Sequence, residues 1–466
     1  MRVYCLGIAG AGVSALASML KSQGHEVSGS DEAAYPPVST YLEREGVAFH
    51  NGFEAGLVPA GVDFGVIGTS AKLGGAENPE LAELKRRGVP LSSFAEFLGR
   101  HTAGRANIVV AGSFGKSTLT AMLAFLLRAA GRDPGWFIGA VPLDLPRTGH
   151  WGADPEMVIE GDEYVVSAED HRSKFLLYHP ADLLISSLTH DHFNMFPTFE
   201  SYQAPFADLV AQFPAGAGKL VCARGFPALE RIVQGREVVW YGLNEGPGWW
   251  ASEVAIGERS RFTLRGPGGQ AIPLETELLG LHNIENLVGA CALLLEKGLA
   301  APEQLQAAVP RFRGVARRLE KKTERASAPV YEGFGSSLEK AQSAIEAIAL
   351  HFPERRRIVV FEPHAFSWRN TEALAWYDQV FAKASLAVIL PPPLHGADRH
   401  SQLSQAEIVA RVAASGVAAV GAASGAEALA LLERDMQGGE VVLLLSSGPL
   451  DGLPASLPAW AEQRFG

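Results

Sequence analysis

Cysteine is scarce in this 466-residue sequence, and long apolar runs are missing. The three cysteines, Cys5, Cys222 and Cys291, lie far apart and outside any C-x-x-C spacing. They exclude a disulfide framework and a cysteine-based zinc site, and they are typical of a reducing compartment. No apolar run approaches the ~18 residues that a membrane-spanning helix needs, and no signal-peptide core follows Met1. We therefore expect a cytoplasmic protein without a membrane partner.

Basic residues are also in deficit, with 40 lysines and arginines against 51 acidic residues and a formal net charge of -11. Such a surface repels phosphate backbones, so nucleic acid is not an expected partner. Hydrophobic residues make up 47% and charged residues 20%, which excludes a disordered or collagen-like chain. The length is about three times the ~150 residues that are typical of one domain, which predicts three domains.

Short apolar runs alternate with helical patterns along much of the chain, which predicts an α/β fold with doubly wound parallel sheets. The alternation of apolar and polar residues over Arg261–Leu279 predicts an antiparallel hairpin. Two polar stretches, Gly99–Ala106 and Arg317–Arg325, are expected to separate the domains, which we place at 1–100, 105–315 and 316–466. The expected strands are Val3–Ile8, His25–Ser28, Gly61–Ser70, Asn107–Ala111, Met157–Glu160, Leu183–Ser187, Lys219–Cys222, Ile358–Phe361, Leu386–Ile389 and Val441–Leu445. The expected helices are Val13–Gln23, Pro79–Arg87, Ser117–Ala130 and Asn283–Lys297.

The first glycine cluster lies between an expected strand and an expected helix. Gly10, Gly12 and Ala15 satisfy G-x-G-x-x-A, and Asp31 ends the next strand about 20 residues later, as in a dinucleotide fingerprint. Such a turn lets a pyrophosphate approach the backbone N–H groups of the helix, and Asp31 can accept a hydrogen bond from a ribose or a base. The alternative is a strand-to-helix turn that uses glycine only for packing.

The second glycine cluster, Ala111–Thr118, ends in Gly115-Lys116-Ser117, like a P-loop. In such a loop the lysine reaches the β- and γ-phosphates and the hydroxyl coordinates Mg²⁺. Val110 stands where the strict pattern has glycine, so the loop is a shortened variant. A dehydrogenase has no use for a second phosphate site and therefore ranks last. An enzyme that activates one substrate with ATP while it holds a nucleotide-linked partner uses both sites.

Acidic and histidine residues follow two further strands. The run Glu160–Tyr164 and the run His190–His192 fall at strand ends close to the P-loop, where they can form a cage for a second Mg²⁺. The alternative is a set of ordinary surface polar residues. His282, Asn283 and Asn286 open a helix, and their side chains either cap it or read adenine edges.

Taken together, these residues resemble the Mur ligase family over nearly the whole chain. Gly7–Asp31, Thr69-Ser70 and Asn78–Leu81 are similar to the UDP-binding start of the family, and Gly112–Thr118 is similar to its shortened ATP loop. The resemblance implies three α/β domains: an N-terminal Rossmann-like domain, a central P-loop ATPase domain and a C-terminal Rossmann-like domain. It also implies ATP and Mg²⁺ as cofactors.

The residues that the resemblance assigns to a UDP-sugar are Gly10, Ala11, Gly12, Ser14, Asp31 and Ser70. Those assigned to ATP are Gly112, Ser113, Gly115, Lys116, Ser117, Thr118, His282, Asn283, Asn286 and Arg318. The catalytic set is Lys116, Glu160 and His192, and the metal set is Ser117, Glu160 and His192.

Within the family, the murein peptide ligases are most similar, and the UDP-N-acetylmuramate–L-alanine ligases come next. The motifs that carry this likeness are Phe137–Pro142, Glu160–Tyr164, Arg172–Phe175 and Phe361–Pro363. The resemblance implies that ATP phosphorylates the carboxylate of a UDP-N-acetylmuramate-like sugar, and that an amino acid or peptide amine attacks the acyl phosphate. It places the chain in cell-wall recycling, as a monomer or weak homodimer.

Several residues depart from the family pattern. Ser187 replaces an asparagine, Ser113-Phe114 replaces Thr-His, and Val165 replaces an aspartate. In the third domain Glu332–Leu338 loses one acid and two histidines, and a further motif carries His364, Trp368 and Arg369. Two alternatives follow: a divergent paralogue that joins another amine and carboxylate, or a regulatory paralogue that binds nucleotide without turnover.

Overall fold

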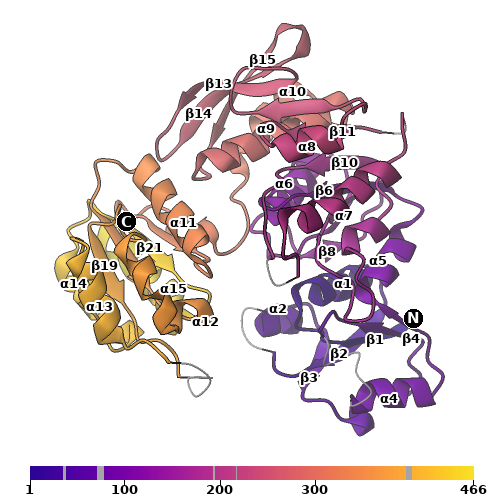
Figure 1. The fold of residues 1–466 in the computed structure, drawn as a ribbon, viewed down its shortest axis with the longest axis horizontal. Coiled ribbons are helices and arrows are strands. Elements are labelled where there is room, and N and C mark those ends of the chain that lie inside the picture. Colours follow the sequence, from indigo (N-terminus) through magenta and orange to yellow (C-terminus); the bar gives the residue numbers. More distant parts are fainter. Residues whose placement is uncertain (35–37, 71–77, 193–194, 217, 395–400) are drawn as a thin grey trace. The chain divides into compact units, whose positions relative to one another are not determined.

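The computed structural model describes residues 1–34, 38–70, 78–192, 195–216, 218–394 and 401–466. It shows an α/β chain with three sheets that follow one another along the sequence (Figure 1). The contacts divide the chain into two compact units. The first consists of Met1–Val254, Phe262–Glu275 and His282–Phe312, and it holds the first two sheets. The second consists of Ala255–Arg261, Thr276–Leu281 and Arg313–Gly466, and it holds the third sheet.

The first sheet has five parallel strands in the order β3-β2-β1-β4-β5, as the alternating pattern predicts. β1 is central and almost entirely buried, so it reads as a continuous apolar run. Ser93 and Glu96 form a capping box that begins α5. The strands are β1 (Arg2–Leu6), β2 (Glu26–Asp31), β3 (Ala48–Asn51), β4 (Phe64–Ile67) and β5 (Leu91–Ser93). The helices are α1 (Ala11–Ser22), α2 (Val38–Arg44), η1 (Ala55–Leu57), α4 (Pro79–Arg86) and α5 (Phe94–Thr102).

A buried carboxylate joins parts of this sheet that are distant in sequence. Glu80 is fully buried, accepts a hydrogen bond from the Tyr4 hydroxyl (3.0 Å) and another from the Glu54 N–H (3.0 Å), and lies 2.8 Å from His50 Nε2. Asn78 caps α4 by accepting from the N–H of Glu80 at 3.1 Å. A buried charge is stable only with such partners, so Glu80 fixes the register of α4 against the strands.

The second sheet has ten strands in the order β15-β14-β13-β12-β11-β10-β6-β9-β7-β8. β6 lies between β10 and β9, and all three run parallel, so their carboxyl ends share one edge. The predicted hairpin is β14 followed by β15, which are neighbours in the sheet. The strands are β6 (Ala106–Ala111), β7 (Gly135–Phe137), β8 (Gly149–His150), β9 (Glu156–Glu160), β10 (Asp182–Ile185), β11 (Leu220–Ala223), β12 (Val239–Gly242), β13 (Trp249–Ala255), β14 (Ser260–Gly266) and β15 (Gln270–Thr276). The helices are α6 (Lys116–Ala129), η2 (Lys174–Leu177), α7 (Phe199–Gln212), α8 (Pro227–Ile232), η3 (Pro267–Gly269), α9 (Leu281–Glu296), α10 (Pro302–Ala308) and η4 (Val309–Arg311).

The third sheet has the order β16-β17-β21-β18-β19-β20, parallel except for β16. Alternate residues of its strands enter two separate cores, since Val359 and Phe361 join one and Ile358 and Val360 the other. Helices α11 and α13 contribute to the first core, and α14 and α15 to the second, so the sheet is doubly wound. The strands are β16 (Arg318–Lys321), β17 (Val330–Gly333), β18 (Arg357–Phe361), β19 (Leu386–Ile389), β20 (Ala418–Gly421) and β21 (Val441–Leu445). The helices are α11 (Leu338–His351), α12 (Phe366–Arg369), η5 (Thr371–Asp378), α13 (Gln405–Ala414), α14 (Gly425–Asp435), η7 (Leu450–Gly452) and α15 (Leu453–Phe465).

A buried histidine explains why the second unit includes two segments from the middle of the chain. His351 on α11 accepts a hydrogen bond from the Gly280 N–H at Nε2 (2.7 Å) and donates from Nδ1 to the Gly257 carbonyl (2.6 Å). Burial lowers its pKa, which keeps the ring neutral with one donor and one acceptor. His351 thereby holds the β13–β14 turn and the start of α9 against α11.

Both polar stretches that were expected to separate domains contain residues of regular secondary structure. Gly99 lies inside α5, and Ala106 begins β6. Arg318–Lys321 of the charged stretch forms β16, an edge strand paired with β17. Glycine at position 99 serves close packing, because a Cβ there would lie 2.1 Å from the Leu177 carbonyl oxygen. The domain boundaries themselves stay predictions. None of the helices described is long and apolar enough to cross a membrane.

Gly99→Ala is expected to lower the free energy of unfolding by about 1–3 kcal/mol, as in overpacked cores. The clash is with backbone of η2, which cannot rotate away, so it outweighs the ~1 kcal/mol that alanine gains over glycine inside a helix. Urea denaturation measures the effect. Gly104→Ala is the matched control, because a Cβ there meets nothing within 4 Å, and we expect a change below about 0.5 kcal/mol. Equal stability of the two variants would contradict the packing role.

Candidate active site

The loop between β6 and α6 has the geometry of a phosphate-binding turn. Gly112 has a φ of 140°, and a Cβ on it would lie 2.2 Å from Ser186 Oγ, so only glycine fits. Gly115 is the N-cap residue of α6 and has a φ of 80°, and no side chain caps the helix. The first N–H groups of α6 have no partner within the helix and carry its positive dipole end. The loop therefore presents donors to an anion.

Two of the residues that depart from the family pattern brace this loop. Ser187, two residues after β10, accepts a hydrogen bond at Oγ from the Phe114 N–H (2.8 Å). Ser113 Oγ donates to the Thr189 carbonyl (2.6 Å) and accepts from the Thr189 N–H (2.8 Å). The two serines attach the P-loop to the strand beside it, which makes them structural supports of the loop.

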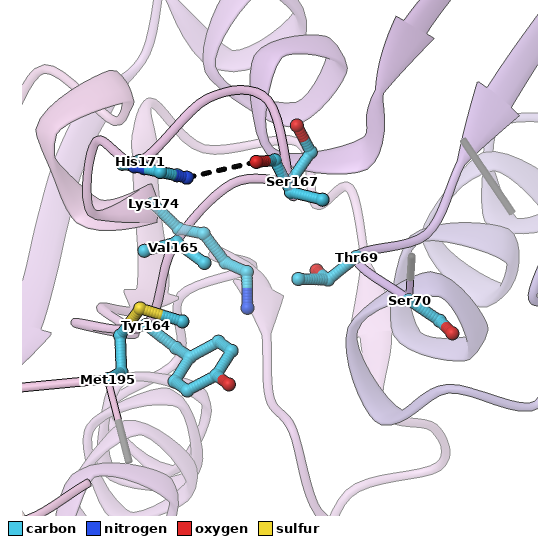
Figure 2. A pocket seen from close by; sticks show the side chains of 9 residues that line it. Thr69, Ser70, Tyr164, Val165, Ser167, His171, Lys174 and Met195 are labelled. Carbon is cyan, nitrogen blue, oxygen red and sulfur yellow. Dashed lines mark hydrogen bonds between the residues drawn. The ribbon is translucent and has the colours of Figure 1, made fainter. Parts of the chain in front are cut away.

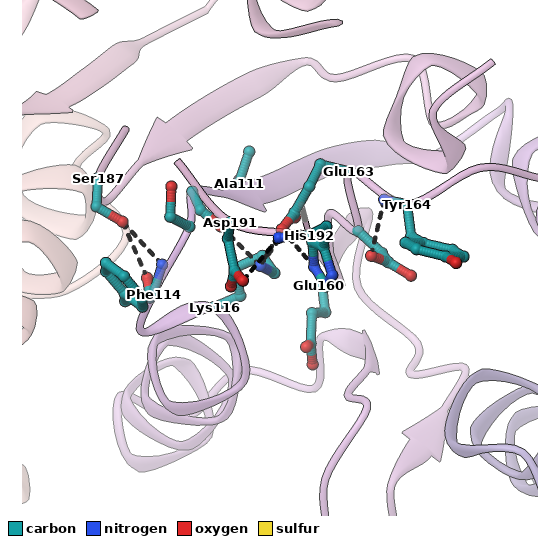
Figure 3. A network of polar contacts seen from close by, with 12 residues as sticks. Ala111, Phe114, Lys116, Glu160, Glu163, Tyr164, Ser187, Asp191 and His192 are labelled. Atoms are coloured by element: carbon teal, nitrogen blue, oxygen red, sulfur yellow. Dashed lines mark hydrogen bonds and ion pairs between the residues drawn. The ribbon is translucent and has the colours of Figure 1, made fainter. Parts of the chain in front are cut away.

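Lys116 and Glu163 form the centre of a buried polar network (Figure 3). Lys116 Nζ lies 2.8 Å from Glu163 Oε2 and donates to the Gly112 carbonyl at 2.7 Å. The Glu163 side chain is 0% exposed, and its Oε1 also lies 3.2 Å from His192 Nε2 and 3.2 Å from the Tyr202 hydroxyl. The Lys116 ammonium, the His192 ring and the Tyr202 phenol therefore converge on one carboxylate.

The charges in this network shift the pKa values of Lys116 and His192. Burial opposes the charged form of Lys116, but the Glu163, Asp162 and Glu160 carboxylates outweigh it and raise the Lys116 pKa. The hydrogen bond to Glu163 raises the pKa of His192 against the effect of burial. The sequence prediction included Lys116 and His192 but not Glu163. Glu163 stands in the acidic run Glu160–Tyr164, yet nothing in the run itself marks which carboxylate pairs with the lysine.

Glu160 and Ser117 meet on the other side of the loop. Ser117 Oγ donates to Glu160 Oε1 at 2.7 Å, and the Gly139 N–H donates to Glu160 Oε2 at 2.6 Å. They meet because β6 and β9 are parallel neighbours that end together. A carboxylate and a hydroxyl are hard oxygen ligands of the kind that Mg²⁺ prefers, so this pair fits one ion.

His192 does not join this pair. Its ring contacts Glu163 rather than Glu160, and the backbone at His192 has a φ of 54°. In the part of the chain that the structure describes, no three His, Cys, Asp or Glu side chains are grouped to hold a metal ion. The structure thus brings together two of the three predicted metal residues, Ser117 and Glu160.

The predicted UDP-sugar residues lie at the carboxyl edge of the first sheet. Gly10, Ala11, Gly12 and Ser14 begin α1, and Ser70 follows β4, the neighbour of β1. A Cβ on Gly12 would lie 2.8 Å from the Phe94 ring, so this glycine has a packing role as well. Asp31 Oδ2 accepts from the Ala9 N–H at 2.9 Å and thereby supports the loop. Ligand contacts of these residues stay predictions.

A cavity of about 410 Å³ opens beside Ser70 (Figure 2). Thr69 and Ser70 line it from the segment after β4, Tyr164 lines it from the loop that follows β9, and Lys174 lines it from the start of η2. It therefore joins the edges of the first two sheets, where the two predicted phosphate sites lie. Its other lining residues are Val165, Ser167, Ala168, His171 and Met195.

Of the residues predicted to contact adenine, Asn286 lies beside the P-loop. A Cβ on Gly115 would lie 3.0 Å from Asn286 Oδ1, and Asn286 Nδ2 lies 3.4 Å from Asn283 Oδ1. His282 lies on the first turn of α9, and its side chain is exposed. Arg318 begins β16 in the second compact unit, so its contact with a nucleotide stays a prediction.

The carboxyl edge of the third sheet has its own polar cluster. Glu332 pairs with Arg317 (3.0 Å) and Lys322 (3.3 Å), and Glu362 accepts from the Ser446 hydroxyl (2.9 Å). The altered residues nearby, Trp368 and Arg369, are buried and donate to the Gly335 and Pro393 carbonyls, at 2.8 Å in each case. Those two residues therefore stabilise the domain itself.

Comparisons with known proteins agree with this geometry. The Mur ligase family, catalytic domain, matches residues 2–106, and the Mur ligase middle domain matches residues 110–294. A UDP-N-acetylmuramate–L-alanine ligase of Chloroflexus aggregans is 33% identical, over 99% of this chain and 98% of its own. The Escherichia coli UDP-N-acetylmuramate–L-alanyl-γ-D-glutamyl-meso-2,6-diaminoheptandioate ligase is 29% identical, over 98% and 97%. The crystal structure of a UDP-N-acetylmuramate–alanine ligase from Thermotoga maritima shares the fold, with a TM-score of 0.77, 18% identity, and coverage of 100% and 98%.

Proposed function

Because this chain belongs to the Mur ligase family and is an ATP-dependent amide ligase, we propose that it joins a peptide amine to the carboxylate of UDP-N-acetylmuramate, as murein peptide ligases do. The observation that carries the proposal is the network at the carboxyl edge of the second sheet. There Lys116, Ser117, Glu160 and Glu163 surround one phosphate-binding turn. The cavity lined by Ser70 is also lined by Tyr164, which follows Glu163 in the sequence.

The chain's own residues account for the first half of the reaction. The N–H groups at the start of α6 bind the ATP phosphates, and Lys116 reaches the phosphoryl group that is transferred to the sugar carboxylate. Glu163 holds the Lys116 ammonium in place and keeps it charged. Charge that develops on the phosphoryl oxygens thus meets a preorganised cation, which is the main source of rate in such transfers.

Magnesium fits the pair Ser117 and Glu160. When bound there, Mg²⁺ would neutralise phosphate charge and orient the nucleotide. Glu160 is prepared for that role because its second oxygen is already held by the Gly139 N–H, so the carboxylate cannot rotate. His192 belongs to the Glu163 network instead and supports the charge balance around Lys116.

The amine attacks the acyl phosphate in the second half of the reaction, and we assign amine binding to the third domain. The runs Arg172–Phe175 and Phe361–Pro363 resemble motifs of the murein peptide ligases, and this likeness favours a tripeptide amine, as in cell-wall recycling. L-Alanine is the second candidate, because a relative at 33% identity is named as an L-alanine ligase. The cluster of Glu332, Glu362 and their partners favours a third possibility, a divergent paralogue, since these acids are already paired within the domain.

A coupled assay of ADP release tests the proposal. With UDP-N-acetylmuramate and ATP·Mg²⁺, we expect turnover with L-alanyl-γ-D-glutamyl-meso-diaminopimelate at a higher kcat/KM than with L-alanine. The control replaces the sugar nucleotide with UDP-N-acetylglucosamine, which has no carboxylate to phosphorylate. A preference for L-alanine would support the second candidate, and no turnover with either amine would contradict both.

A further inference from the structure

Lys174 is a nearly buried cation that the phosphate chemistry does not use. Its side chain is 7% exposed, and its ammonium lies 2.7 Å from Asp162 Oδ2. The same nitrogen lies 5.4 Å from the centre of the Phe94 ring and 5.3 Å from that of Tyr164. Such ring faces attract a cation and hold it in one place.

The backbone fixes the position of this side chain. The Lys174 N–H donates to the Tyr164 carbonyl (3.0 Å), and the Phe175 N–H donates to the Asp162 carbonyl (3.1 Å). Asp162 is held in turn, because its Oδ1 accepts from the Tyr164 N–H at 3.0 Å. These hydrogen bonds join the backbone at residues 162–164 to that at residues 174–175, and they hold the Lys174 side chain in position.

The ammonium of Lys174 has donors to spare. It carries three N–H groups, and among the described residues only Asp162 accepts from it. Figure 2 shows the nitrogen directed into the cavity of about 410 Å³. Leaving charged donors unpaired in a buried place costs free energy, so an acceptor from a ligand is favoured there.

The lining of the cavity suits an anion. None of its nine lining residues is acidic, Lys174 is cationic, and Thr69 and Ser70 add hydroxyl groups. Charge-assisted hydrogen bonds from an ammonium together with neutral hydroxyl donors are the usual partners of a carboxylate.

We propose that Lys174 binds the carboxylate of the nucleotide-sugar substrate and thereby selects a sugar that carries one. The inference rests on the proposed function, since it names the group that recognises the acceptor. The sugar's carboxylate is favoured over that of the amine because Thr69 and Ser70 follow β4, which pairs with β1 at the predicted nucleotide loop. The cavity also adjoins the loop after β9, so the carboxylate would lie toward the Lys116 network.

Equilibrium binding without ATP tests this assignment. Titration calorimetry compares UDP-N-acetylmuramate with UDP-N-acetylglucosamine, which has the same nucleotide and ring but no lactyl carboxylate. For Lys174→Met we expect the affinity for the muramate to fall at least about tenfold, as for loss of a charged hydrogen bond. The affinity for the glucosamine compound should change less than about twofold, because its binding does not use the ammonium. Lys85→Met, on the exposed face of α4, is the control and should change neither.

The possible results separate the inference from the proposed function. Equal weakening of both ligands would show a structural role for Lys174 and overturn the inference, and so would no change for either. A raised KM for the amine with unchanged muramate affinity would overturn it too, because the bound carboxylate would then be that of the amine. If the unaltered protein bound neither nucleotide sugar, both the proposed function and the inference would fail.

Discussion

Lys116→Met is expected to lower kcat by about 10²–10³-fold, with little change in the affinity for the nucleotide sugar. Methionine keeps the length and apolar stem of lysine but has no charge to place against the transferred phosphoryl group. The effect falls on kcat because the cation is worth most where charge develops in the transition state. Steady-state ADP release, with each substrate varied in turn, measures it.

Lys219→Met is the matched control for this change. Lys219 also lies in the second sheet's part of the chain, and its ammonium is 3.4 Å from Glu296. It lies at the amino end of β11, the opposite edge from the P-loop, so we expect kcat to stay within about twofold of that of the unaltered protein. A Lys116→Met protein that turns over at the normal rate would refute the catalytic role of the loop.

Glu163→Gln is expected to cost about 3–5 kcal/mol of unfolding free energy in the absence of nucleotide. Glutamine keeps the shape of the side chain but removes the charge that pairs with Lys116 and His192, and the Lys116 side chain is only 14% exposed. An unpaired buried cation is then left behind. We expect the deficit to shrink when ATP·Mg²⁺ is added, because its phosphates supply the missing negative charge. Urea denaturation with and without nucleotide measures both effects.

Tyr202→Phe separates loss of charge from loss of a hydrogen bond at the same carboxylate. The Tyr202 hydroxyl lies 3.2 Å from Glu163 Oε1 and 3.0 Å from Ser113 Oγ, and burial raises its pKa, so it stays neutral. Its removal should cost about 1 kcal/mol, and addition of ATP should not reduce that cost. Equal costs for the two variants would mean that Glu163 acts as a hydrogen-bond acceptor rather than as a charge.

Much of the fold was predictable because its signals are local. β19 and β21 have the predicted bounds, and the predicted β6 differs by one residue, since a buried parallel strand is a continuous apolar run. The P-loop followed from Gly115, Lys116 and the strand and helix around them. The failures occurred where glycine or charge was taken as a sign of a linker. Gly99 is a contact glycine, and Arg318 begins an edge strand, where charged residues are common.

The sequence alone determined the three sheets, the two glycine turns and the set of residues at the strand ends, because strand polarity and hydrophobic period are properties of short segments. Tertiary structure decided which of those residues touch. It joined Lys116 to Glu163 rather than to Glu160, made Ser187 a support of the P-loop, and directed Lys174 into a cavity beside Ser70. Such pairings depend on the register of strands far apart in sequence and on burial, and both are set only when the whole sheet packs.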